Sequence, residues 1–108
     1  MHVDNDNSML LRDLIFVQNN VTYGSGGGVY FNSRNLNSLC EGLTFVENVA
    51  GESGGALTFL TSNLNAMIRN CTFTGNSAGA LGERYLILHY YLYVADIKLF
   101  SWCDLYLL

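Results

Sequence analysis

The sequence has no proline and few charged residues, and each shortage excludes a class of protein. Without proline, the chain of 108 residues cannot be a collagen. Five Lys and Arg residues stand against nine Asp and Glu, for a formal net charge of -4. With no basic cluster, the chain lacks the electrostatic surface that a nucleic-acid backbone requires. The length suits one small domain, and a hydrophobic content of 50% could fill its core, which argues against a multidomain enzyme and a disordered tail.

Cysteine and histidine are too sparse and too scattered for a metal centre or a redox motif. The cysteines Cys40, Cys71 and Cys103 form no CxxC pair, and no histidine lies at ligand spacing from them. His2 and His89 are isolated in the sequence. We therefore predict no metal and no cofactor, and we interpret the cysteines as small core residues.

No targeting signal is visible at the N-terminus. Asp4 and Asp6 stand where a secretory signal would be basic, and no apolar segment of the required kind follows them. We expect either an intracellular protein or an internal piece of a longer chain.

The chain does contain a repeat. The pattern F-x-x-N occurs at Phe16, Phe45 and Phe73, with spacings of 29 and 28 residues, and the glycine-rich segment 25–31 matches 53–59 at an offset of 28. Units that present equivalent side chains at a fixed period stack and share one core. The structural repeat positions predicted in this way are Phe16, Asn19, Gly27, Gly28, Phe45, Asn48, Gly54, Gly55, Phe73 and Asn76.

The local pattern within each repeat predicts strands and turns. Apolar residues alternate in Val29-x-Phe31 and Leu57-x-Phe59, and likewise in Leu14-x-Phe16 and Leu43-x-Phe45, which is the period of a half-buried strand. We expect the glycine pairs to supply positive φ at a corner. We expect the asparagine of F-x-x-N to be a second turn residue, because asparagine tolerates the left-handed region, and stacked asparagines could form a hydrogen-bonded ladder.

Alignment on the phenylalanines predicts which residues of neighbouring repeats are in contact. Arg12, Glu41 and Arg69 occupy one column, so Glu41 is expected between two arginines on an exposed face. Cys40 and Cys71 are three residues out of register, about 10 Å apart along a strand, and we predict no disulfide between them. The apolar columns expected to build a continuous core are Leu10, Leu39 and Met67; Leu11, Cys40 and Ile68; Leu14, Leu43 and Cys71; and Leu36 with Leu64.

The motif pair G-G-A-[ILV] and F-x-x-N, repeated every 28 or so residues, resembles the right-handed parallel β-helix repeats of the chlamydial polymorphic outer membrane protein family. The match covers roughly residues 8 to 82. The resemblance implies an all-β fold, a right-handed parallel β-helix of about three coils, and an adhesive role at the cell surface or after secretion. We therefore expect an extracellular or outer-membrane location, with glycans or surface proteins as partners and no nucleic acid.

A segment of different character begins at Glu83. All 11 glycines precede it, and Tyr85–Ala95 is an aromatic and apolar run of 11 residues. We divide the chain into β-helix repeats at 1–82, interpreted as a fragment of a longer solenoid, and a non-repeat tail at 83–108. The tail is either a cap for the open end of the repeats or out-of-frame sequence. A membrane span is disfavoured because it needs about 20 apolar residues.

An enzyme remains the alternative, since parallel β-helices include pectate lyases and polygalacturonases. No two acidic residues share a column in neighbouring repeats, so paired carboxylates for glycoside hydrolysis are not predicted. We predict a non-enzymatic β-helix repeat module, with a fragment of a carbohydrate-active enzyme, its catalytic coils absent, as the alternative. Asn20 and Asn70 match the N-glycosylation pattern, and in a sequence this rich in Asn, Ser and Thr two chance matches are the default interpretation.

Overall fold

The computed structural model describes residues 1–4, 8–32, 34–52, 54–59 and 65–79, together with four short strands in 86–107. Every regular element in these ranges is a β-strand. No helix of the described residues has the length and apolar character that crossing a membrane requires. The prediction of an all-β fold is confirmed.

The strands form five sheets, and every pairing within them is parallel. In spatial order, the first sheet contains β1 (His2–Val3), β5 (Val29–Phe31) and β9 (Leu57–Phe59). The second contains β14 (Tyr93–Ala95), β10 (Met67–Arg69), β6 (Leu39–Glu41) and β2 (Leu10–Arg12). The third contains β15 (Lys98–Leu99), β11 (Thr72–Thr74), β7 (Thr44–Val46) and β3 (Ile15–Val17). The fourth contains β12 (Ser77–Ala78), β8 (Val49–Ala50) and β4 (Asn20–Val21), and the fifth β13 (Leu86–Leu88) and β16 (Leu105–Leu107).

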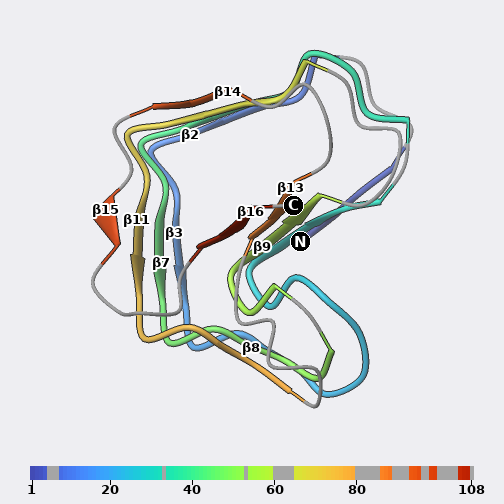
Figure 1. Cartoon of the computed structure of the whole chain (residues 1–108), viewed down its shortest axis with the longest axis vertical. Helices are drawn as coiled ribbons and strands as arrows, with labels where there is room; N and C mark the ends of the chain where they lie inside the picture. The colour runs from blue at the N-terminus through green and yellow to red at the C-terminus, as the bar shows by residue number, and fades with distance from the viewer. Residues whose placement is uncertain are drawn as a thin grey trace.

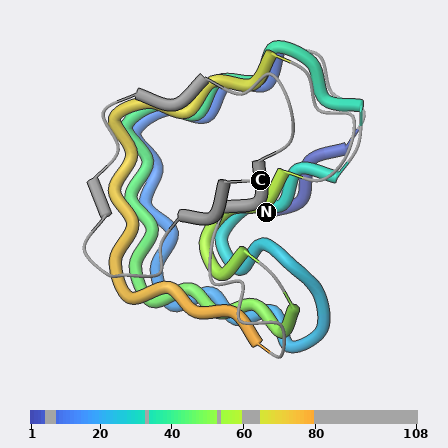
Figure 2. The backbone as a smooth tube through the Cα atoms, viewed as in Figure 1, coloured from blue at the N-terminus to red at the C-terminus, as the bar shows by residue number. Residues whose placement is uncertain are grey.

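The second, third and fourth sheets each take one strand from each sequence repeat. We call β2–β5 repeat 1, β6–β9 repeat 2 and β10–β12 repeat 3. Phe16 pairs with Phe45, and Phe45 with Phe73, so the register read from the sequence is confirmed. Successive repeats follow nearly the same outline when viewed along the stack (Figure 1; Figure 2). The arrangement is that of parallel strand stacks, consistent with a β-helix.

The core consists of columns of equivalent side chains, one from each repeat. The rings of Phe16 and Phe45 stack with centroids 5.1 Å apart, and those of Phe45 and Phe73 at 4.9 Å. A second column stacks Phe31 on Phe59 at 4.3 Å. Such ring pairs add a stabilisation of about 0.5–1.5 kcal/mol beyond area burial. The core is therefore shared between repeats, and no single repeat contains it.

One predicted core column is wrong. Leu10, Leu39 and Met67 lie on the outer side of the second sheet, where Leu10 is 51% exposed and the other two are half-buried. The reason is the alternation of a strand: the adjacent column, Leu11, Cys40 and Ile68, points inward and is buried. Leu36 is half-buried, and Leu64 lies outside the described residues.

The corners between the sheets are formed by residues with positive φ at repeated positions. Three corner columns are Ser8, Asn37 and Asn65; Asp13, Gly42 and Asn70; and Gln18, Glu47 and Gly75. The expectation that the asparagine of F-x-x-N is the left-handed residue is wrong, because the residue before it adopts that conformation and leaves the asparagine side chain to point inward. The tolerance of asparagine for positive φ is used instead at the other two corners.

The glycines of the Ser-Gly-Gly motif have two different roles. Gly26 and Gly54 have φ values of 70° and 60°, which confirms the predicted left-handed corner for Gly54. Gly27, Gly28 and Gly55 do not have positive φ, so the expectation of a left-handed corner is wrong at these positions. A Cβ on Gly28 would lie 2.7 Å from the carbonyl oxygen of Ala56, and Cβ atoms on Gly27 and Gly55 would overlap the carbonyl oxygens of Gly55 and Ser77 respectively. These three positions require glycine because adjacent repeats approach each other closely there.

Both ends of the chain add strands to the stack. At the N-terminus, β1 pairs with β5 and buries Val3, a strand that the sequence analysis did not predict. Within 83–108, β14 pairs with β10 and β15 with β11, while β13 pairs with β16 and contacts β9. The side chains of this segment lie outside the described residues, so its assignment as a cap or as out-of-frame sequence stays a prediction.

Candidate functional site

The predicted asparagine ladder is confirmed. The Asn48 amide nitrogen donates to Asn76 Oδ1 at 2.9 Å and to the Phe16 carbonyl at 2.8 Å, while Asn48 Oδ1 accepts from Asn19 Nδ2 at 2.8 Å. Asn76 Nδ2 donates in turn to the Phe45 carbonyl at 3.1 Å. Asn48 and Asn76 are buried, so this column satisfies backbone groups that water does not reach. Its role is structural.

The charge column on the outer face is also confirmed. Glu41 Oε2 lies 2.9 Å from Arg12 Nε, and Glu41 Oε1 lies 2.8 Å from Arg69 Nη2. The arginine side chains are 53% and 43% exposed, so solvent screens both pairs. A neighbouring outer contact joins Gln18 Nε2 to Glu47 Oε2 at 2.8 Å. The side face thus presents ordered polar rows to solvent.

Cys40 and Cys71 are buried free thiols, in agreement with the prediction of no disulfide. Cys40 and Cys71 nevertheless lie closer together than the separation expected from three residues along a strand. The reason is that the chain turns at Asn70 before it reaches Cys71. The Cys71 thiol donates to the carbonyl of Cys40 at 3.6 Å and to that of Arg69 at 3.3 Å. Burial raises the pKa of both thiols, and for Cys40 the neighbouring Cys71 raises it further. Both are therefore protonated and unreactive at neutral pH.

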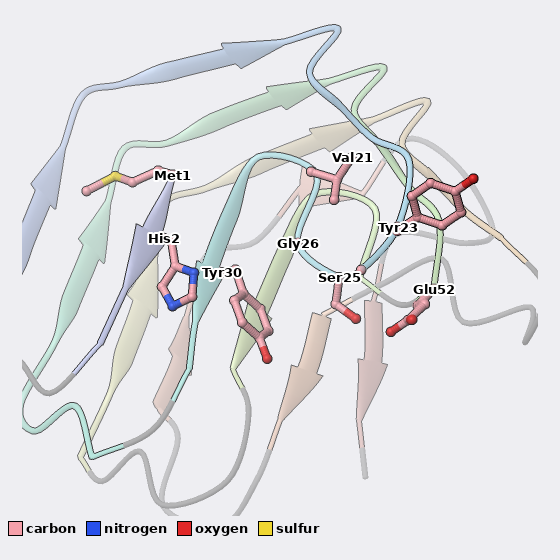
Figure 3. A pocket seen from close by; sticks show the side chains of 9 residues that line it. Met1, His2, Val21, Tyr23, Ser25, Gly26, Tyr30 and Glu52 are labelled. Atoms are coloured by element: carbon pink, nitrogen blue, oxygen red, sulfur yellow. The ribbon is translucent and has the colours of Figure 1, made fainter.

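A cavity of about 360 Å³ opens at the N-terminal side of the stack. Figure 3 shows His2 and Tyr30 side by side along adjacent strands, with Ser25, Glu52 and Tyr23 on the loops beside them. The volume falls within the range of about 300–1,000 Å³ found for small-molecule pockets. The lining residues are Met1, His2, Val21, Tyr23, Gly24, Ser25, Gly26, Tyr30 and Glu52.

The elements around the cavity are fixed by the stacking of the repeats. Parallel pairing of β1 with β5 sets His2 opposite Tyr30, and their rings meet edge to face at 5.2 Å. The two loops on the other side are joined by a hydrogen bond from the Glu52 amide to the Gly24 carbonyl at 2.9 Å. Strand pairing and this hydrogen bond thus connect the backbone segments around the cavity, as a preformed binding site requires.

The lining residues suit binding better than catalysis. Tyr23 is 91% exposed and offers an uncovered aromatic face, while Glu52 is exposed and its carboxylate has no hydrogen-bond partner among the described residues. Glu52 is the one carboxylate among the residues described as lining the cavity, whereas glycoside hydrolysis uses a pair. Within the described ranges, no three His, Cys, Asp or Glu side chains gather closely enough to hold a metal ion.

Sequence reasoning missed this cavity because three of its lining residues, His2, Tyr23 and Glu52, lie outside the repeated motifs. It interpreted His2 as isolated, yet His2 precedes Tyr30 by 28 residues, and Val3 precedes Phe31 by the same distance. Extending the register to the first residues would have paired these positions. Among the predicted repeat positions, the phenylalanine and asparagine columns and the close-packed glycines maintain the stack, and none of them lines the cavity.

Comparison with family models, curated proteins and solved structures finds no match to this chain.

Proposed function

We propose that this protein is a non-enzymatic extracellular or cell-surface β-helix repeat module, adhesin-like, that binds glycans or proteins. The observation that carries the proposal is the cavity in which exposed aromatic rings lie beside the Glu52 carboxylate. The resemblance of the repeat motifs to the chlamydial polymorphic outer membrane protein family supports the surface location and the adhesive role. Detection of the intact chain on unpermeabilised native cells, or in their medium, tests the location.

The finer fold assignment in this proposal is a right-handed β-helix. All described pairings are parallel, and connections between parallel strands of one sheet are right-handed in about 98% of cases. The stack offers ordered outer rows and a rigid base for loops, which is how repeat proteins build binding surfaces. A structure determined by crystallography tests the hand directly.

The cavity favours a glycan over a protein as its ligand. Sugars have apolar C–H faces that pack on aromatic rings and hydroxyl groups that pair with carboxylates and hydroxyls. Tyr23 and Tyr30 supply rings with hydroxyl groups, Ser25 supplies a hydroxyl, and Glu52 supplies an acceptor, all around one opening. The cavity has room for one or two sugar rings and is too small for a protein segment with tertiary structure.

The test is binding of the full chain to a printed array of neutral, acidic and amino-sugar oligosaccharides. We expect retention of a subset of these, with affinity reduced about tenfold by Tyr30→Ala or Glu52→Gln, since each change removes about 1–2 kcal/mol of contact. Tyr30→Phe keeps the ring and is expected to lose less affinity than Tyr30→Ala.

The matched control is Glu47→Gln, which removes the same charge from an exposed site outside the cavity, where Glu47 pairs with Gln18. Glycan binding is expected to persist in this variant. If no oligosaccharide is retained, or if Glu47→Gln and Glu52→Gln act equally, the cavity is not a glycan site.

A further inference from the structure

Asn70 is an exposed asparagine that the stack of repeats does not use. It lies at the corner between β10 and β11, where its φ value is 52°. Its side chain is exposed and has no hydrogen-bond partner among the described residues. The equivalent positions in repeats 1 and 2 are Asp13 and Gly42, so this column does not continue as a ladder of amides. The Asn70 amide therefore remains in solvent.

Asparagines at comparable places in the stack are held by side-chain contacts. Asn37 and Asn65 form another exposed corner column, in which Asn65 Nδ2 donates to Asn37 Oδ1 at 3.2 Å. Asn48 and Asn76 are buried in the ladder. None of these four asparagines begins the motif N-x-S/T, whereas Asn70 does. The motif thus falls on a corner asparagine whose amide is free.

The other side chain of the motif is also on the outer surface. Thr72 supplies the hydroxyl that the motif requires two residues after the asparagine. It begins β11 and is half-buried on the outer side of the third sheet, since the following Phe73 points into the core. Cys71, between the two, is buried and is not the proline that the motif excludes. The fold therefore keeps both recognised side chains of the motif outside the core.

We propose that Asn70 is an N-glycosylation site. In this modification Asn70 Nδ2 forms a bond to C1 of the first sugar of a lipid-linked oligosaccharide. The bond between C1 and the pyrophosphate oxygen breaks, the lipid pyrophosphate leaves with the electron pair, and Nδ2 loses a proton to a base of the transferase. Because such transferases act on chains that are being exported, this proposal rests on the extracellular location proposed above.

The second match to the motif, at Asn20, is a poorer place for a glycan. Asn20 begins β4, and the next residue, Val21, lines the cavity, as does Tyr23. A bulky glycan on Asn20 would compete with a ligand for the opening of the cavity. Asn70 lies in repeat 3, and none of the described lining residues belongs to its motif. Glycosylation at Asn70 is therefore compatible with the proposed binding site.

The test uses the full chain purified from its native source. The chain is denatured, treated with peptide N-glycosidase in water enriched in heavy oxygen, and then digested with trypsin. The glycosidase converts a glycosylated asparagine to an aspartate that carries the heavy isotope. We expect the peptide 70–84, which follows Arg69, to carry the label at position 70 and to keep Asn76 unlabelled.

An unlabelled Asn70, or a label at Asn20 alone, would overturn the proposal. If the chain with an unlabelled Asn70 is nevertheless found outside the cell, the proposed location stands and only the modification fails. If the chain is found only inside the cell and Asn70 is unlabelled, both fail.

Variants produced in the native host test whether the motif directs the modification. Thr72→Val removes the hydroxyl but keeps the branched shape, and we expect the label at position 70 to be lost. Thr72→Ser keeps a hydroxyl and is expected to retain the label. The matched control is Thr74→Val, the same change on the same face of β11 but outside the motif, and it should also retain the label. Valine fits this face, because Val46 has the place of Thr74 in β7. A label that persists in Thr72→Val, or is lost equally in Thr74→Val, would overturn the proposal.

Discussion

Asn48 is the residue on which the buried polar contacts of the stack depend most. Its side chain joins all three repeats. Substitution by alanine would remove the side-chain donor to the Phe16 carbonyl and the acceptor of both Asn19 amides, while Asn76 Oδ1 would keep only the Asn48 backbone amide of its two Asn48 donors. An unsatisfied buried polar group costs about 1–3 kcal/mol. We expect Asn48→Ala to lower the free energy of unfolding by about 3 kcal/mol, measured by urea denaturation.

Asn19→Ala is the control for this prediction, because Asn19 has the same position in repeat 1 but is exposed. Its replacement removes only the side-chain hydrogen bond that Asn19 donates to Asn48 Oδ1. We expect the free energy of unfolding to fall by about 1 kcal/mol or less. Equal losses for the two variants would show that the ladder does not stabilise the interior.

The buried thiols predict a loss of stability at alkaline pH. Burial raises the pKa of Cys40 and Cys71 above the ordinary value of 9.0, so the folded protein keeps protons that the unfolded chain releases. Their contribution is complete below about pH 9 and decreases as pH rises, by up to about 1.4 kcal/mol per pH unit for each thiol. We expect urea midpoints to fall between pH 8 and 10, and to fall less in the Cys40→Ala, Cys71→Ala double variant. An identical pH profile for the two proteins would contradict this.

At the scale of the columns, the phenylalanine column is expected to stabilise the fold more than the charge column does. Phe45 is fully buried between Phe16 and Phe73, and its replacement by alanine leaves a cavity, so we expect Phe45→Ala to cost about 3–5 kcal/mol. Glu41→Gln loses two screened ion pairs, and we expect about 1 kcal/mol or less, decreasing with salt. Thermal unfolding of both variants at low and high salt measures the difference. A larger loss for Glu41→Gln would mean that surface charge specifies the register.

At the scale of the whole molecule, the direction of strand pairing predicts a gradient of amide protection across the described stack. The amides of Thr44 and Val49 donate to the Leu14 and Asn19 carbonyls of repeat 1. The equivalent amides of Ile15 and Asn20 lie on the outer edges of β3 and β4, and neither has a backbone acceptor among the described residues. We expect hydrogen exchange to be slow at Thr44 and Val49 and fast at Ile15 and Asn20. Equal protection at equivalent positions would show that the outer edges of β3 and β4 are covered in solution.

Much of the fold could be predicted from the sequence because a parallel stack repeats its constraints. The phenylalanine column, the asparagine ladder and the Arg12–Glu41–Arg69 contacts all follow from one alignment. The wrong predictions lie where the backbone conformation of a residue, or the direction of its side chain, depends on the corner beside it. Gln18 and Glu47, unremarkable in the sequence, adopt the left-handed conformation assigned to the following asparagines. Leu10 faces outward because Leu11 faces the core.

The sequence by itself determined the period, the register and the all-β class, since identical side chains at a fixed spacing can share a core only if they stack. Only the tertiary structure decided the cavity, because His2, Tyr30 and Glu52 come together through the pairing of β1 with β5 and the stacking of two loops, and the repeated motifs include neither His2 nor Glu52. It also decided which glycines are needed for space and which for positive φ. A repeat specifies its neighbours, whereas a site built from unrepeated residues depends on where the chain ends and corners meet in space.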